Sequence, residues 1–107
     1  PLGGAAAGFL DKTPIPSALL ALRRPHPPMG LGKMLAACGH VSAMMDLSDG
    51  LAKDLPRLCK ASQVGASIDP TALPPHPAVL GRADALAMMT SFGEEYGLLF
   101  TADAKAD

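Results

Sequence analysis

The chain has no tryptophan, one tyrosine and three phenylalanines, so large aromatic side chains can supply little of its core. Hydrophobic residues still make up 49% of the sequence, and alanine and leucine dominate them. We therefore expect a core of small and branched aliphatic side chains, with the six methionines filling irregular gaps. A chain of 107 residues is long enough for one small domain.

An excess of charge of one sign is also missing. Nine Lys and Arg residues face ten Asp and Glu residues, and the absence of a basic patch argues against nucleic-acid binding as a main role. No stretch approaches the ~18 apolar residues of a membrane span, and residues 1–10 lack the pattern of a signal peptide. Cys38 and Cys59 are too few for a zinc site or a disulfide framework, so we expect buried free thiols in a cytoplasmic protein.

Helical and extended patterns alternate along the chain. Apolar spacing predicts helices over 2–10, 16–23, 30–38, 49–60 and 78–89, and strands over 41–47, 66–69 and 95–102. Pro56 is expected to kink or interrupt its helix. The proline-rich segments 24–28 and 70–77 are predicted loops, in which His26 and His76 are solvated. This order predicts a layered α/β (α+β) domain with helices over a small sheet.

The most informative stretch, residues 45–51, runs from a predicted strand directly into a predicted helix. Period two places Asp46 and Ser48 on one face of the strand. Ser48 is then a candidate N-cap, with Asp49 in the first turn, where the helix dipole favours negative charge. An ordinary capped helix explains those two residues, but a cap does not require Asp46. Because Mg²⁺ prefers carboxylates together with substrate phosphates, Asp46 and Asp49 are also typical of half a magnesium site.

Two segments of the chain match a known pair of motifs. The first is Asp46-Leu47-Ser48-Asp49-Gly50-Leu51 with Asp54-Leu55. The second is Gly93-Glu94-Glu95-Tyr96-Gly97-Leu98-Leu99-Phe100-Thr101. They resemble the motifs Asp-x-Ser-Asp-Gly-Leu-x-x-Asp-Leu and Gly-Gly-Glu-Asp-Tyr-Glu-Leu-Leu-Phe of thiamine-monophosphate kinases. Segments 24–35 and 61–74 are also similar to that family, so the resemblance covers nearly the whole chain. The kinases share a superfamily with aminoimidazole ribonucleotide synthetase, selenophosphate synthetase and a hydrogenase maturation protein.

The resemblance implies a fold, a reaction and a set of site residues. The fold would be the C-terminal domain of aminoimidazole ribonucleotide synthetase-related proteins, a small mixed sheet covered by helices. The reaction would be the ATP-dependent phosphorylation of thiamine monophosphate to thiamine diphosphate. By motif match, Asp46 and Asp49 would hold Mg²⁺, Ser48 would contact ATP, and Glu94 or Glu95 would line the thiamine-monophosphate pocket. Since phosphoryl transfer depends on positioning and charge neutralisation, none of these is assigned as a catalytic residue.

Some positions depart from the family pattern. Phe92 stands where the kinases usually have the first Gly, Glu95 replaces Asp, and Gly97 replaces Glu. These departures leave two alternatives open: another ATP-dependent enzyme of the superfamily, or a binding module that keeps the fold without the chemistry. The family's N-terminal domain, with further metal carboxylates, has no counterpart here. We therefore expect a truncated C-terminal domain, inactive alone, from a cytoplasmic parent in which the N-terminal domains form a homodimer.

Overall fold

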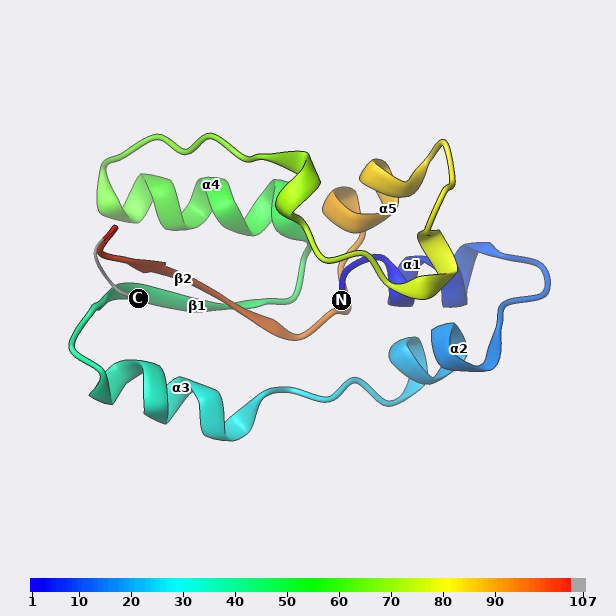
Figure 1. Cartoon of the computed structure of the whole chain (residues 1–107), viewed down its shortest axis with the longest axis horizontal. Helices are drawn as coiled ribbons and strands as arrows, with labels where there is room; N and C mark the ends of the chain where they lie inside the picture. Colours follow the sequence, from blue (N-terminus) through cyan, green and yellow to red (C-terminus); the bar gives the residue numbers. More distant parts are fainter. Residues whose placement is uncertain (105–107) are drawn as a thin grey trace.

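The computed structural model describes residues 1–104, and Figure 1 shows two strands between helices. The elements follow one another as α1 (Gly4–Leu10), α2 (Pro16–Arg23), α3 (Met29–Ala37), β1 (Val41–Leu47), α4 (Leu51–Ser62), the 3₁₀ turns η1 (Pro70–Ala72) and η2 (Pro77–Val79), α5 (Ala85–Ser91) and β2 (Gly97–Ala102). The strands lie between α4 and α3, while α1, α2 and α5 gather at the other end of the molecule. This arrangement confirms the predicted layered fold with helices over a small sheet.

The sheet joins the ends of the two matched segments. β1 and β2 are antiparallel, and the register pairs Asp46 with Leu98 and Leu47 with Gly97. The strands predicted from alternation at 41–47 and from the aromatic-rich run at 95–102 are therefore confirmed, the second with a start two residues later. The expectation of a mixed sheet is corrected, because within residues 1–104 the sheet has two strands of opposite direction.

Two predicted elements between the motifs are wrong. Residues 66–69 are not a strand: they are extended but exposed, and no neighbouring strand pairs with them. The helix predicted over 78–89 divides into the turn η2 and the helix α5, which starts at Ala85. Gly81 has φ +71° and so leaves the right-handed helical region between them. By contrast, α4 continues through Pro56 without a break, although its proline cannot donate a backbone hydrogen bond.

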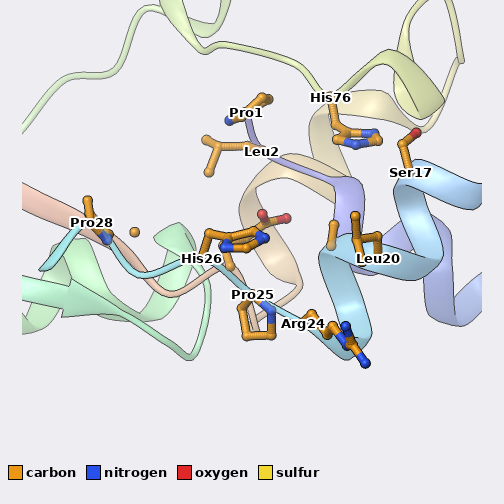
Figure 2. A pocket seen from close by; sticks show the side chains of 12 residues that line it. Pro1, Leu2, Ser17, Leu20, Arg24, Pro25, His26, Pro28 and His76 are labelled. Carbon is orange, nitrogen blue, oxygen red and sulfur yellow. The ribbon is translucent and has the colours of Figure 1, made fainter.

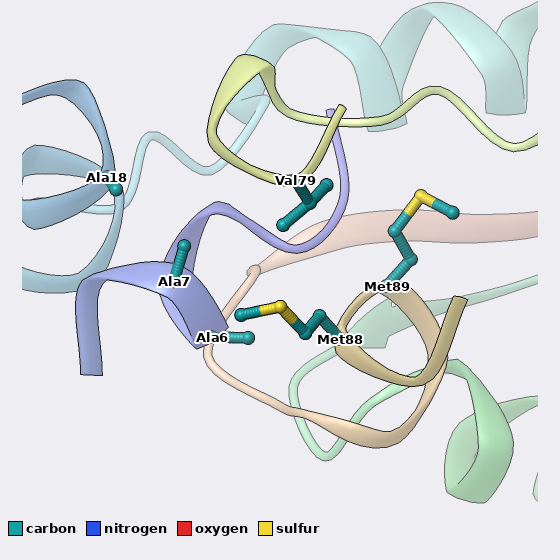
Figure 3. Close-up of a cluster of buried hydrophobic side chains, with 6 residues drawn as sticks. All are labelled: Ala6, Ala7, Ala18, Val79, Met88 and Met89. Atoms are coloured by element: carbon teal, nitrogen blue, oxygen red, sulfur yellow. The ribbon is translucent and has the colours of Figure 1, made fainter. Parts of the chain in front are cut away.

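The main hydrophobic core lies where α1, α2, η2 and α5 meet. Its buried members are small or aliphatic, as the composition predicts, but only two of the six methionines are among them: Ala6, Ala7, Ala18, Val79, Met88 and Met89 (Figure 3). Small residues let the backbones approach closely. A Cβ atom added at Gly8 would lie 2.4 Å from the carbonyl oxygen of Ala18, so α1 and α2 can pack in this way only with glycine at that position.

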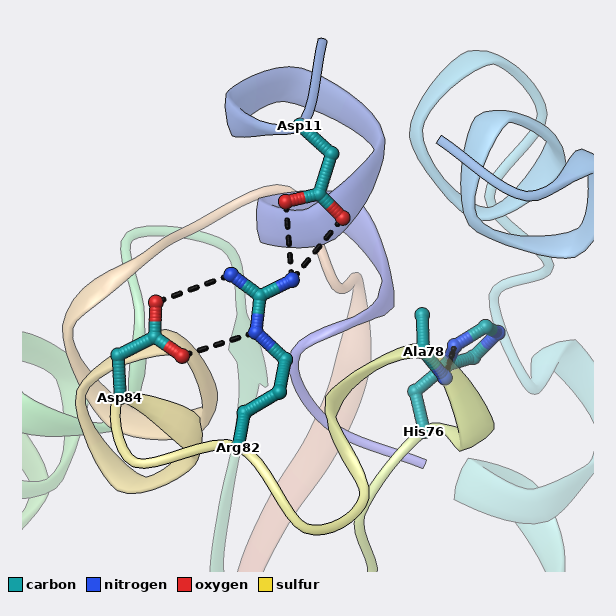
Figure 4. A network of polar contacts seen from close by, with 5 residues as sticks. All are labelled: Asp11, His76, Ala78, Arg82 and Asp84. Carbon is teal, nitrogen blue, oxygen red and sulfur yellow. Dashed lines mark hydrogen bonds and ion pairs between the residues drawn. The ribbon is translucent and has the colours of Figure 1, made fainter. Parts of the chain in front are cut away.

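Polar contacts fix the segment between η1 and α5 against this core. Arg82 donates hydrogen bonds to Asp11 at 2.9 and 3.0 Å and to Asp84 at 2.8 and 3.0 Å (Figure 4). His76 is buried, which corrects the expected solvated side chain, and its Nδ1 accepts the backbone N–H of Ala78. The proline loop therefore ends in a capped turn that packs on α1.

The helix α3 is the least buried of the α-helices. None of its residues is buried, and Met29 and Met34 remain 82% and 70% exposed. The helix approaches the sheet at Gly32, where an added Cβ would lie 3.8 Å from side-chain atoms of Leu98 and Met44. Cys38, which follows this helix, is an exposed free thiol and corrects the expectation of a buried one. In the described part of the chain, no helix is long and apolar enough to cross a membrane.

Candidate functional site

The turn between β1 and α4 is shaped by a buried carboxylate. Asp54 has no exposed surface, and its Oδ2 accepts the backbone N–H groups of Ser48 at 3.0 Å and Asp49 at 2.9 Å. The N-cap of α4 is Gly50, with φ +97°, so the interpretation of Ser48 as a side-chain N-cap is wrong. A residue in the first turn of the helix instead reaches back to the N–H groups of Ser48 and Asp49, which precede the helix, whereas a side-chain cap at Ser48 would have accepted N–H groups inside the first turn.

A guanidinium group connects that buried carboxylate to the exposed one. Nη1 of Arg57 donates to Oδ2 of Asp49 at 2.6 Å and to Oδ1 of Asp54 at 2.8 Å. Arg57 therefore holds the pKa of the Asp49 carboxyl below its ordinary value, and the charge of Lys53 lowers it further. Asp49 is ionised and half-exposed next to a turn whose shape Asp54 maintains.

The two matched segments meet backbone to backbone at this turn. The N–H of Glu94 donates to the carbonyl oxygen of Ser48 at 2.8 Å. A Cβ at Gly93 would lie 2.4 Å from the same oxygen, and one at Gly50 would lie 2.8 Å from the carbonyl oxygen of Phe92. Glycine at both positions is therefore required for the contact, which brings together segments about 45 residues apart in the chain.

The second segment carries an unusual backbone. Glu94 and Tyr96 have φ values of +68° and +50°, in the left-handed region that non-glycine residues rarely adopt. Hydrogen bonding to Glu94 and its charge raise the pKa of Tyr96, and burial and the charges of Asp46 and Asp49 raise it further. Three carboxylates from two distant segments thus raise the pKa of one phenol.

Glu95 turns to the other side of its segment. Its Oε1 accepts the N–H of Gly3 at 2.7 Å, at the N-terminus of α1. Burial is the main cause that raises the pKa of Glu95, while hydrogen bonds from the backbone of Gly3 and Ala5 oppose it. This side chain lines a cavity of about 380 Å³, and Figure 2 shows His26 and His76 on different sides of that cavity.

The predicted site residues are therefore divided between two places. Asp46, Ser48, Asp49 and Glu94 lie at or beside the β1–α4 turn, whereas Glu95 lies in the cavity next to α1. In the sequence, Asp54 is recognised only as part of the first motif, and nothing there assigns a role to Arg57. The spacing of Asp49, Asp54 and Arg57 could have indicated that one side of α4 faces the turn. The burial of Asp54 and its hydrogen bonds to two backbone N–H groups depend on the tertiary fold.

The donor atoms at the turn fit part of a magnesium shell. Asp46 and Asp49 offer carboxylate oxygens and Ser48 offers a hydroxyl, which are hard donors of the kind Mg²⁺ prefers. Over residues 1–104, no three His, Cys, Asp or Glu side chains form a group that could hold a metal ion. The chain thus provides an incomplete ligand set, as in sites where phosphates and water supply the remaining oxygens.

Comparison with known proteins shows which family the chain matches. Residues 18–107 match the family described as AIR synthase related protein, C-terminal domain. The thiamine-monophosphate kinase of Haemophilus influenzae is 38% identical over 111 aligned residues, which cover 94% of this chain and 33% of the relative. That of Salmonella typhimurium is 48% identical over 63 residues, which cover 56% of the chain and 19% of the relative.

A solved structure gives the same correspondence in three dimensions. The crystal structure of thiamine-monophosphate kinase from Stenotrophomonas maltophilia superposes with a TM-score of 0.84 at 35% sequence identity. The match covers 96% of this chain and 37% of that structure. The chain therefore spans about a third of the length of the curated relatives it matches.

Proposed function

Because the chain belongs to the AIR synthase related protein family as a C-terminal domain, we propose that it forms the C-terminal part of a thiamine-monophosphate kinase. The parent enzyme transfers a phosphoryl group from ATP to thiamine monophosphate, which yields thiamine diphosphate and ADP. Kinases of this name from two bacteria align with it at 38% and 48% identity, which supports the proposal.

We assign the roles at the turn from the match to the kinase motifs, with which the chemistry of each side chain is compatible. The carboxylates of Asp46 and Asp49 hold Mg²⁺, and the hydroxyl of Ser48 binds the phosphates of ATP. Glu94 contacts thiamine monophosphate from the neighbouring segment. Bound Mg²⁺ supplies neutralisation of phosphate charge and alignment of the attacking and leaving oxygens. Because the reaction needs positioning more than covalent chemistry, a rigid turn that presents acidic oxygens suits it.

One observation carries this proposal: the N–H of Glu94 donates to the carbonyl oxygen of Ser48 at 2.8 Å. It holds the acidic turn and the second matched segment at hydrogen-bond distance. A metal-bound nucleotide at Ser48 and a substrate at Glu94 are then neighbours, which is the proximity that phosphoryl transfer requires.

The rest of the parent protein completes the site in this proposal. Its relatives are about three times as long as the chain. In this proposal, the corresponding additional residues of the parent supply the missing metal ligands and most of the nucleotide site. We therefore expect the 107-residue chain to have no kinase activity by itself. The parent is proposed to be a cytoplasmic homodimer that is joined through its N-terminal domains.

A second candidate is another ATP-dependent enzyme of the same superfamily. Glu95 stands where the kinases have Asp, and its carboxylate is engaged by the N–H of Gly3 at 2.7 Å. Because the carboxylate of Glu95 is bound to the N-terminus of α1, a thiamine ligand has one fewer side-chain contact available to it. This observation favours a different substrate with the same nucleotide chemistry.

Calorimetric titration of the full-length parent with MgATP and with thiamine monophosphate tests both candidates. We expect both ligands to bind, and Asp49→Asn to weaken MgATP binding at least about tenfold, as expected when a metal ligand loses its charge. Asp69→Asn is the matched control, because Asp69 is an exposed carboxylate that only caps the turn η1. MgATP binding without thiamine monophosphate binding would support the second candidate. Binding of neither ligand would contradict both and favour a module without this chemistry.

A further inference from the structure

Arg57 occupies the carboxylate that the proposed function gives to a metal ion. Its Nη1 lies 2.6 Å from Oδ2 of Asp49, the shorter of its two contacts, and 2.8 Å from Oδ1 of Asp54. Over residues 1–104, Arg57 makes no other side-chain hydrogen bond, so a single nitrogen joins the exposed carboxylate to the buried one.

The two contacts of that nitrogen differ in environment. The Asp54 side chain is fully buried, whereas the side chains of Asp49 and Arg57 are 48% and 56% exposed. An ion pair that is exposed to water in this way contributes little to stability, because solvent screens it. A divalent cation carries twice the charge of the guanidinium and binds carboxylate oxygen at about 2.1 Å, inside the hydrogen-bond distance. The Asp49 contact is therefore the one that a divalent cation can replace.

We propose that Arg57 is a positioning residue that serves as an internal counter-ion for Asp49 and is displaced from it when a divalent cation binds. The proposal rests on the proposed function, because it requires Asp49 to be a metal ligand. Asp54 retains the guanidinium after displacement, so Arg57 stays close to the turn. The counter-ion keeps Asp49 oriented and neutralised before the cation arrives, and it lowers the affinity of the free site for that cation.

Titration of the full-length parent chain with Mn²⁺, followed by the electron paramagnetic resonance signal of the free ion, measures this competition without reference to activity. We expect Arg57→Gln to bind Mn²⁺ about threefold to tenfold more tightly than the unaltered chain, the range that loss of an exposed ion pair allows. Lys60→Gln removes the same charge from the last turn of α4 and is expected to leave the affinity unchanged.

The outcomes separate the role of Arg57 from the role of Asp49. Unchanged or weaker binding in Arg57→Gln, with binding abolished in Asp49→Asn, would overturn the counter-ion role and leave the metal ligand in place. Mn²⁺ binding that is equal in Asp49→Asn and the unaltered chain would overturn both. A tightening of equal size in Lys60→Gln would also overturn the proposal, because the effect would then be one of net charge.

A measurement on the unaltered chain keeps the test independent of whether Arg57→Gln folds. The ¹⁵N relaxation of the Arg57 Nε–H group reports how rigidly the guanidinium is held. We expect its order parameter to fall on saturation with Mg²⁺, and to be already low in Asp49→Asn. An order parameter that stays high with Mg²⁺ bound at Asp49 would overturn the displacement.

Discussion

Around α1, α2 and α5, neighbouring elements approach through alanine and glycine, whereas around the β1–α4 turn they meet through backbone amides and charged side chains. In the first region, the added Cβ of Gly8 would meet the carbonyl oxygen of Ala18 at 2.4 Å. In the second, the carboxylate of Asp54 accepts two backbone N–H groups and one guanidinium. The first region is sensitive to added volume and the second to a lost acceptor.

This difference matters for function because the proposed ligands lie in the polar region. A packed hydrophobic core excludes water. Carboxylates that bind a metal ion beside phosphates must instead be accessible to the metal ion and to the phosphates. Asp46 and Asp49 are exposed while Asp54, five residues after Asp49, is fully buried. The buried carboxylate of Asp54 therefore fixes the backbone that carries the exposed carboxylates.

The largest expected effect follows from removal of the buried acceptor. Asp54→Ala leaves the N–H groups of Ser48 and Asp49 without their partner and should lower the free energy of unfolding by about 3 kcal/mol. Urea unfolding measures it. The matched control is Asp69→Ala, which removes an exposed carboxylate that accepts the N–H of Thr71 at 2.9 Å. Equal losses in the two variants would show that burial at the turn is not what stabilises it.

A single methyl group should disturb the helical region by almost as much. Gly8→Ala forces α1 away from Ala18 and is expected to cost about 2 kcal/mol, the usual effect of overpacking. Gly30→Ala is the control, because nothing lies within 4 Å of a Cβ at that position of α3. It should raise stability by about 0.5 kcal/mol through helix propensity. Thermal unfolding in which both variants shift in the same direction would contradict the close approach of α1 and α2.

The ion pairs of Arg82 test whether charge also matters in the helical region. Arg82→Gln loses the contacts to Asp11 and Asp84, and we expect a small but measurable loss of stability at low ionic strength. The loss should shrink in 1 M salt, where the Debye length is about 3 Å. Arg23→Gln, at the exposed end of α2, serves as the control for net charge. A loss for Arg82→Gln that is independent of salt would indicate packing of the side chain instead.

The smallest effect concerns Glu95, which connects the two regions through Gly3. Because burial raises its pKa in the folded chain above the ordinary 4.5, the folded state binds the proton more tightly than the unfolded state. Its contribution to stability is therefore complete below pH 4.5 and is lost as the pH rises through the raised value. Glu95→Gln should remove this slope from a plot of unfolding free energy against pH. A slope that persists in the variant would have to arise from another group.

Local pattern was sufficient for the elements whose residues face one buried side. The alternation at 41–47 predicted β1, and the helices predicted over 2–10, 16–23, 30–38 and 49–60 begin and end within two residues of their observed bounds. The strand predicted at 66–69 failed because that run never reaches a partner strand. The helix predicted over 78–89 failed because periodicity does not reveal the left-handed conformation of Gly81.

For the candidate site, the sequence supplied the residue types but not their connections. It indicated Asp46 at the end of a strand, which β1 confirms, but it placed Asp49 in the first turn of a helix that begins only at Leu51. It could not show that Asp54 is buried, because an aspartate inside a helix is usually solvated. It also could not distinguish Glu94 from Glu95, since only the left-handed backbone at Glu94 and Tyr96 turns the two side chains to different surfaces.

Because residues 64–69 are exposed, the number of residues between the two matched segments can change without altering the contact between them. These residues pack against nothing buried and lie between α4 and η1. Closing a longer flexible loop costs little, about 0.6 kcal/mol for each doubling of its length. Residues could therefore be inserted there during evolution, or by an engineer who adds a reporter peptide, while the turn at Ser48 and the amide of Glu94 keep their relative position.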